Sequence, residues 1–188
     1  MKNNDYIRLG GILLAITSVV ALLLGFFNDA TRDIIAASKE EAKIASMQSV
    51  MPQAAAFTLL EGKAAGSAAE VQAASDAQGA SLGWCFTMTP KGYGGTITLM
   101  VGVNTDLTVS GVEIVDHGET AGLGANAQNP QWLSQFTGKS GTLSVVKNAP
   151  QDDQIQAVTS ATITSKAVTG AVNEALALAA DLAEEAAQ

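Results

Sequence analysis

Residues 82–103 of the chain read LGWCFTMTPKGYGGTITLMVGV, and this stretch decides the fold. Its two ends, residues 82–90 and 95–103, are rich in aromatic and β-branched side chains, which favour extended strands. The connector between them, KGYGG at residues 91–95, is rich in glycine and typical of a turn. The stretch therefore predicts two antiparallel strands joined as a hairpin.

The chain after this hairpin adds strands and then a helix. Residues 107–116, LTVSGVEIVD, alternate apolar and polar positions, and residues 141–147, GTLSVVK, predict one more strand. From about Ser165 to Ala187 an alanine-rich stretch predicts a helix. Its core-facing positions are Val168, Val172, Leu176, Leu178 and Leu182. Strands followed by a helix that packs on them predict an α+β domain.

The start of the chain predicts a membrane anchor. Residues 9–27, LGGILLAITSVVALLLGFF, contain no charged residue. At about 1.5 Å per residue they span roughly 28 Å, close to the hydrocarbon core of a bilayer. The apolar core of a cleavable signal peptide is shorter, about 7–15 residues, so we favour a retained transmembrane helix. Basic residues flank it on both sides, so the positive-inside rule does not decide its orientation.

The residues after this anchor predict a juxtamembrane amphipathic helix over 29–52, with Asn28 or Asp29 as its cap and Pro52 just beyond its end. Apolar side chains recur in it at helical spacing: Ile34, Ile35, Ile44, Met47 and Met51.

Residues 61–80 are rich in Ala, Gly and Ser and leave two interpretations open. They form either a linker or a short strand at 71–74 followed by a turn at 76–79. We thus expect three parts in the chain: a membrane anchor with the transmembrane helix at 1–28, the juxtamembrane helix at 29–52, and a domain of antiparallel strands with a C-terminal helix at 53–188.

Composition excludes several classes of function. The net charge of −8 argues against a nucleic-acid partner, because such surfaces are basic. A single cysteine, Cys85, and a single histidine, His117, exclude an internal disulfide, a cysteine metal cluster and a multi-histidine metal site. Any chemistry must therefore come from hydroxyls, carboxylates or a bound cofactor.

One cluster of hydroxyls predicts an anion site. Residues 157–168, AVTSATITSKAV, carry hydroxyls at Thr159, Ser160, Thr162, Thr164 and Ser165, directly before the predicted C-terminal helix. One or two of them are explained as caps for the free amides of a helix start. The whole set, together with the positive end of the helix, would hold a phosphoryl group.

A second unusual stretch is DHGETAGLGA, residues 116–125. Its glycines at 118, 122 and 124 suggest a loop whose backbone approaches a ligand closely. The alternative is a glycine-rich hairpin loop with solvated polar residues. A phosphate-gripping loop of the nucleotide-binding type is disfavoured, because no helix obviously follows and no lysine is present.

Both stretches resemble motifs of the FMN-binding domain family. TSATITS, residues 159–165, is similar to the family's (S/T)GAT-x-TS flavinylation motif, and HGETAGLGA, residues 117–125, is similar to its H-x-ETPGLG loop. The sequence departs from the family at Ser160, where the family has Gly, at Ala121, where it has Pro, and at Gln156, where it has Asp. A serine fits the first of these positions without strain if its φ is negative.

The resemblance implies a cofactor and a set of site residues. Thr162 would be joined to FMN by a phosphoester bond. The residues expected to line the flavin are Glu119, Thr120, Gly122, Leu123 and Gly124. Those expected around the phosphate are Thr159, Ser160, Ala161 and Thr164. His117 would orient the loop, and Trp84, Tyr93 and Trp132 would either stack on the flavin or belong to the core.

The order of anchor, juxtamembrane helix and domain resembles the G subunits of Rnf electron-transport complexes. That resemblance implies an electron relay in a membrane ferredoxin:NAD oxidoreductase complex coupled to sodium-ion or proton translocation. The chain would then be a subunit that catalyses neither half-reaction by itself. It also implies integral membrane and iron–sulfur proteins of the complex as partners, a flavin transferase for maturation, and an extracytoplasmic domain on a single-pass anchor.

Three alternatives stay open at this point. One is the C subunit of the sodium-translocating NADH:quinone reductase, which shares the domain and the flavin linkage. Another is a cofactor-free, membrane-anchored binding module in which the hydroxyl cluster is only a cap. The third is a hydrolase with a Ser or Thr nucleophile and His117, which would need a third group to orient its base.

Overall fold

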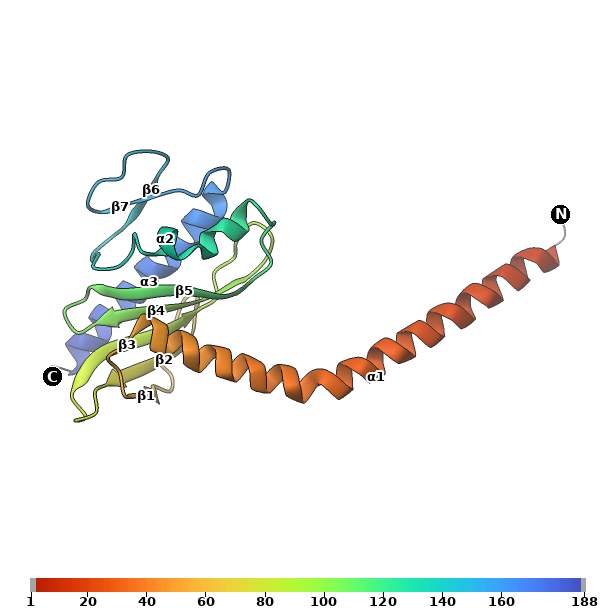
Figure 1. The fold of residues 1–188 in the computed structure, drawn as a ribbon, viewed down its shortest axis with the longest axis horizontal. Coiled ribbons are helices and arrows are strands. Elements are labelled where there is room, and N and C mark those ends of the chain that lie inside the picture. The colour runs from red at the N-terminus through yellow and green to blue at the C-terminus, as the bar shows by residue number, and fades with distance from the viewer. Residues whose placement is uncertain (1–2, 187–188) are drawn as a thin grey trace. The chain divides into compact units, whose positions relative to one another are not determined.

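The computed structural model describes residues 3–186 and, within the first helix, all side chains except those of residues 3–5, 7, 33–37, 39 and 40. Two compact units divide the chain, Met1–Ala42 and Lys43–Gln188 (Figure 1). The second unit contains every strand and also the last two turns of the first helix.

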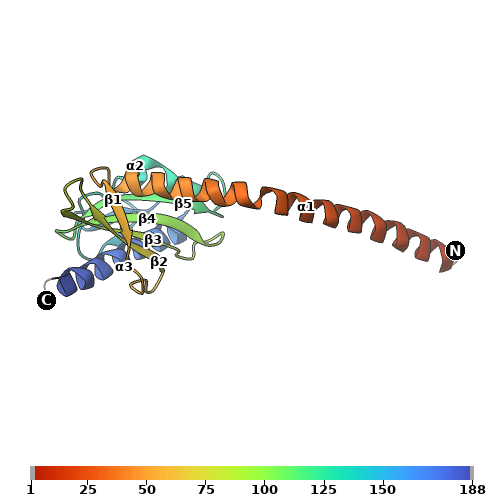
Figure 2. The ribbon, with the colours of Figure 1, turned by 90° about the horizontal axis from the view of Figure 1, so that it is seen from below.

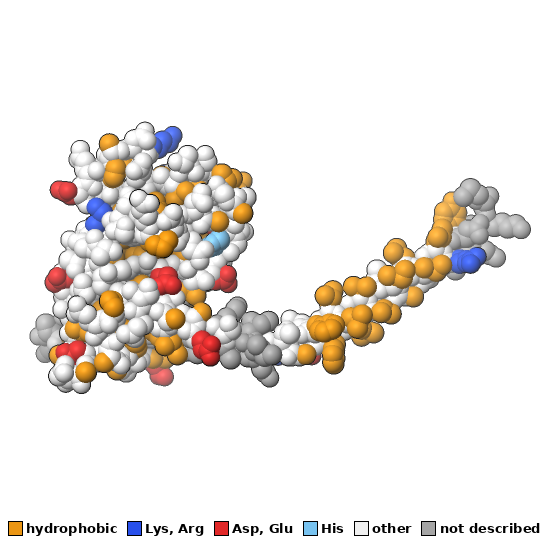
Figure 3. Space-filling model, in the orientation of Figure 1, with side chains coloured by type: hydrophobic (Ala, Val, Ile, Leu, Met, Phe, Trp, Pro, Cys, Tyr) orange, Lys and Arg blue, Asp and Glu red, His pale blue; other side chains and the backbone are white. Residues whose placement is uncertain are grey.

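The first helix, α1 (Asn3–Val50), runs for 48 residues without interruption. The predicted cap at Asn28 or Asp29 is therefore wrong, because helix-forming residues continue on both sides and no proline occurs before Pro52. One segment, Arg8–Arg32, is long and apolar enough to cross a membrane, and none of it is buried by protein (Figure 3). A soluble core helix would be mostly covered, so the exposure fits a segment that faces lipid.

The second unit is built on a five-stranded antiparallel sheet whose strands follow one another in chain order. They are β1 (Ala56–Leu59), β2 (Ala68–Ser75), β3 (Ser81–Met88), β4 (Ile97–Asn104) and β5 (Val109–His117). The hairpin predicted from residues 82–103 is confirmed as β3 and β4, in which Phe86 lies opposite Val101. The strand predicted at 107–116 is confirmed as β5.

Residues 61–80 are not a linker, because β2 occupies residues 68–75. The alternative of a strand with a turn at 76–79 is confirmed, and the strand is longer than predicted. The Asp76 carboxylate accepts hydrogen bonds from the amides of Gln78 and Ala80, which fixes the turn into β3. Alanine and serine are weak strand formers, so pairing with β1 and β3 on both sides decides this element.

The sheet is covered on both faces (Figure 2). Helix α3 (Thr162–Ala186) packs Val168, Val172 and Leu176 against one face, in the larger of two hydrophobic clusters. The end of α1 covers the other face, where the predicted apolar positions Met47 and Met51 are buried against Cys85 and Met100. Ile44 is half exposed, and the side chains of Ile34 and Ile35 lie outside the described residues.

Two glycines let the end of α1 approach the sheet closely. Gly102 and Gly111 lie opposite each other in β4 and β5, and a Cβ at either would press on Val50. The Ser110 hydroxyl donates to the Val50 carbonyl oxygen at 2.7 Å, and Lys43 forms an ion pair with Glu70 of β2. The last turns of α1 are therefore a packed part of this unit and not a free tether.

Shorter elements complete the fold: η1 (Gly124–Gln128), α2 (Pro130–Leu133), β6 (Ser144–Val146) and β7 (Gln154–Gln156). The strand predicted at 141–147 is β6, which pairs in parallel with β7 and not with the main sheet. The C-terminal helix is confirmed, but it begins at Thr162 and not at Ser165. An α+β domain of antiparallel strands with a C-terminal helix is thus confirmed.

Candidate functional site

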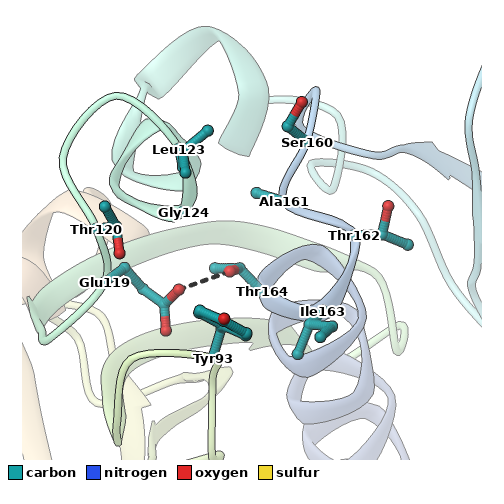
Figure 4. Close-up of a pocket in the computed structure, with 10 residues that line it drawn as sticks. All are labelled: Tyr93, Glu119, Thr120, Leu123, Gly124, Ser160, Ala161, Thr162, Ile163 and Thr164. Atoms are coloured by element: carbon teal, nitrogen blue, oxygen red, sulfur yellow. Dashed lines mark hydrogen bonds between the residues drawn. The ribbon is translucent and has the colours of Figure 1, made fainter.

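Three segments that are far apart in the sequence meet around one cavity of about 420 Å³ (Figure 4). They are the connector between β3 and β4, the loop after β5, and the first turn of α3. The residues that line the cavity are Tyr93, Glu119, Thr120, Leu123, Gly124, Ser160, Ala161, Thr162, Ile163 and Thr164. Eight of these ten residues belong to the set predicted from the motifs, and the structure brings them together.

The first turn of α3 presents free backbone amides to this cavity. Ala161 precedes the helix and has no side-chain oxygen with which to cap it. In the part of the chain that the structure describes, the amides of Thr162, Ile163 and Thr164 have no hydrogen-bond acceptor. Free amides and the positive end of a 25-residue helix attract an anion. The helix start is thus a ready site for a phosphate group.

The five clustered hydroxyls divide into groups with different positions. Ser165 is buried, accepts from the Val158 amide and donates to the Ala161 carbonyl oxygen, both at 2.9 Å. Thr164 is also buried and donates to Glu119 Oε2 at 2.7 Å. Ser160 and Thr162 line the cavity and have no such internal role. Plain capping therefore does not account for the cluster.

Thr159 and Gly122 were predicted at the site but do not line the cavity. Thr159 lies instead at a second hollow, which it shares with Trp132 and Gln156. Gly122 has a φ of 77°, which favours glycine, and its role is to turn the loop that carries Leu123 and Gly124.

Ser160 has a left-handed backbone conformation, with a φ of 61°. The condition under which a serine fits this position without strain, a negative φ, is therefore not met. Ser160 and Ala161 form the sharp turn by which the chain enters α3, and the turn requires a conformation that costs a side-chain-bearing residue about 1–2 kcal/mol. This strain explains why glycine suits the position in the FMN-binding domain family.

Glu119 joins all three segments of the site. Its Oε1 accepts from the Gly94 amide at 2.9 Å, and its Oε2 accepts from Thr164. Burial opposes ionisation of this carboxyl, but the hydrogen bonds from Thr164, Gly94 and Tyr93 outweigh it and hold its pKa below the ordinary glutamate value. A Cβ at Gly124 would overlap the carboxylate, which explains the need for glycine there.

His117 lies beside the cavity and orients the loop. Its Nδ1 accepts from the Glu119 amide at 3.2 Å, and its Nε2 is 3.4 Å from Gln128 Oε1. The first bond requires an unprotonated Nδ1, so Nε2 carries the proton and donates to Gln128.

The three candidate aromatic residues have separate positions. Trp84 is buried in the main core, and Trp132 packs edge-on against Phe136 while its indole donates to the Gln156 carbonyl oxygen at 2.7 Å. Tyr93 alone lines the cavity. Ile163 lines it as well and was missed by sequence reasoning, because it occupies the variable position of the motif.

Comparison with known proteins agrees with this geometry. Residues 92–177 match the model of the FMN-binding domain, and these residues contain all three segments of the cavity. The fold and the site thus define an FMN-binding domain protein.

The similarity extends along most of the chain. The G subunit of the Na(+)-translocating ferredoxin:NAD(+) oxidoreductase complex of Acetobacterium woodii is 34% identical over 182 residues, which cover 88% of this chain and 87% of that protein. The G subunit of the ion-translocating oxidoreductase complex of Cereibacter sphaeroides is 33% identical over 189 residues, covering 89% and 82%. The chain belongs to the family of G subunits of ion-translocating oxidoreductase complexes, as the order of its anchor, juxtamembrane helix and domain predicted.

The crystal structure of NqrC from Shewanella oneidensis has a related fold. Its TM-score is 0.53 at 23% sequence identity, and the match covers 68% of this chain and 67% of that one. This likeness concerns the fold alone, whereas the G subunits match in sequence along nearly the whole chain.

Proposed function

We propose that this chain is the FMN-carrying electron relay of a membrane ferredoxin:NAD oxidoreductase complex, a translocase that moves sodium ions or protons. The names of the relatives support the complex and its coupling to ion transport. The FMN is held covalently, through a phosphoester to Thr162. The observation that carries this proposal is the uncapped start of α3, where the Thr162 hydroxyl and three free amides meet at one cavity.

The residues around the cavity fit FMN. The free amides of α3 would hold the phosphate, and the Ser160 hydroxyl lies close enough in sequence to add a donor. Of the ten lining residues only Glu119 carries a charge at neutral pH, and both of its oxygens are already engaged by protein donors. The remaining lining, with Leu123 and Ile163, suits a largely apolar ring system.

When bound, FMN supplies the electron-transfer chemistry, and the protein supplies its position. Thr162 and the free amides of the first turn of α3 would hold the phosphate, and the loop after β5 would limit the movement of the ring. Glu119, on this loop, accepts hydrogen bonds from α3 and from the β3–β4 connector, so the three segments around the cavity keep their spacing. The reactions at ferredoxin and at NAD belong to the iron–sulfur and integral membrane proteins of the complex, and a flavin transferase attaches the cofactor.

We propose that the domain lies on the extracytoplasmic side, carried by an uncleaved α1. A tether would be useful there, because a dissociated cofactor would be lost to the surroundings. Protease added to intact cells should digest the domain. Complete protection, in cells whose surface proteins are cleaved, would contradict this orientation.

The Thr162→Ala substitution tests the attachment site. Wild-type protein co-expressed with a flavin transferase should have the mass of the chain plus one FMN less one water, and Thr162→Ala should lose that addition completely. Thr159→Ala is the matched control, since its hydroxyl lies three residues away at the other hollow, and it should keep the flavin. Intact-mass spectrometry decides between them. Wild-type protein without the added FMN mass would refute the proposed function. Flavin still attached to Thr162→Ala would show that Thr162 is not the attachment residue.

A further inference from the structure

We infer that Tyr93 is the aromatic side chain on which the flavin ring stacks. This inference rests on the proposed function, because it assumes that FMN occupies the cavity beside Thr162. Among the ten residues that line the cavity, Tyr93 is the only aromatic one. Its side chain is 73% exposed, so a face of the ring is free to receive a flat ligand.

The backbone around Tyr93 is held so that its side chain is presented to the cavity. The Gly92 amide donates to the Gly95 carbonyl oxygen at 2.7 Å, and the Gly94 amide donates to Glu119. A Cβ at Gly92 would overlap the Glu119 carboxylate, and a Cβ at Gly94 would overlap the Gly118 backbone. One glycine on each side of Tyr93, Gly92 and Gly94, thus allows the connector to press against the loop after β5.

Two further exposed apolar side chains complete the arrangement. Leu123 is 45% exposed and Ile163 is 56% exposed, and each lines the same cavity from a different segment. Figure 4 shows Tyr93 near the first turn of α3, with Leu123 on the loop across the cavity. Exposed large apolar side chains that gather around one cavity mark a binding surface. A planar, mostly apolar heteroaromatic ring is the ligand that a phenol and two aliphatic side chains would enclose.

The arrangement assigns Tyr93 a positioning role. It limits the orientations open to a ring that the Thr162 linkage would hold only at the phosphate end. A tyrosine phenol in contact with an excited flavin is an efficient quencher of its emission by electron transfer. Tyr93 should therefore keep the fluorescence of the bound flavin low.

The experiment compares flavin emission at equal flavin content in FMN-loaded wild type, Tyr93→Leu and Tyr93→Phe. Both variants should emit several-fold more than wild type, since both lack the phenol. The visible circular dichroism of the flavin should fall in Tyr93→Leu but persist in Tyr93→Phe, which keeps an aromatic face. Trp132→Phe is the control, because Trp132 does not line this cavity, and it should leave the emission unchanged.

Unchanged emission in both Tyr93 variants, with the flavin still attached, would overturn the role of Tyr93 and leave the proposed function standing. Absence of flavin from wild type is a separate result, which would refute the proposed function itself. Because the Tyr93 side chain is exposed, both variants should unfold at the wild-type urea midpoint. If Tyr93→Leu does not fold, the emission of Tyr93→Phe alone decides.

Discussion

Ser160→Gly should make the protein more stable, although it removes a side chain beside the proposed flavin attachment site. Ser160 has a φ of 61°, and this left-handed conformation costs a serine about 1–2 kcal/mol relative to glycine. Glycine has greater freedom in the unfolded chain, which offsets about 0.4–1 kcal/mol of that gain. The net expectation is a rise of about 0–1.6 kcal/mol in the free energy of unfolding.

The assay is urea unfolding of the globular unit, Lys43–Gln188, followed by circular dichroism. For a unit of this size, 1 kcal/mol corresponds to roughly 2–4 °C in Tm, so a thermal scan gives a second reading. Ser134→Gly is the matched control. Ser134 is also an exposed serine at a helix end, but its φ is −62°, so glycine relieves no strain there and should lower stability.

A fall in stability for Ser160→Gly as large as that for Ser134→Gly would refute the reasoning, since it would show that no strain is stored at the entrance of α3. Flavin attachment to Thr162 should persist in Ser160→Gly, because the free amides of α3 are unaffected. The same result would show that the Ser160 hydroxyl is dispensable for holding the phosphate.

Two further predictions concern Glu119 and the glycines under α1. The pKa of Glu119 is lower in the folded protein than in the unfolded chain, so its ionised form stabilises the fold. This contribution is fully present above the ordinary glutamate pKa of 4.5 and is lost as the pH falls through the lower, folded-state pKa. The stability difference between wild type and Glu119→Gln, measured by urea unfolding, should therefore be constant near neutral pH and shrink in acid; a difference independent of pH would mean that the charge does not matter. Gly102→Ala should lower the free energy of unfolding by roughly 1–3 kcal/mol, because its Cβ would overlap the Ser110 hydroxyl, which bonds to Val50, and would press on Met51 and Val50 at the end of α1. Gly170→Ala, in open space within α3, should raise it by about 0.5–1 kcal/mol, and equal effects of the two changes would contradict the close approach of α1 to the sheet.

Local patterns in the chain were sufficient to predict much of the fold. Aromatic and β-branched residues in 82–103 predicted β3 and β4, and the alternation of apolar residues in 107–116 predicted β5, because all three strands bury side chains in the main core. The apolar run at 9–27 predicted the membrane segment from length alone. Where the pattern was weak, prediction failed or stayed open: β2 is rich in alanine, and only its pairing with neighbouring strands makes it a strand.

The boundary of α1 shows a different limit. Polar residues at 28 and 29 are good caps, but a cap forms only where the preceding residues leave the helical conformation. Nothing before Pro52 makes them do so, and the helix continues until its last turns reach the sheet. The contact of Val50 with Gly102 and Gly111 could not be read from the sequence, because those residues are more than 50 positions away along the chain.

At the site, the sequence by itself determined which residue types are present: a threonine-rich entrance to a helix and a loop with Glu119 among glycines. Only the tertiary structure decided their roles. Thr164 and Ser165 form hydrogen bonds with other parts of the protein, whereas Thr162 lines the cavity. Of the three candidate aromatic residues, Tyr93 lines the cavity and Trp84 and Trp132 do not. The physical reason is that a motif specifies chemistry within a few residues, whereas the direction and exposure of a side chain depend on the packing of segments distant in the sequence.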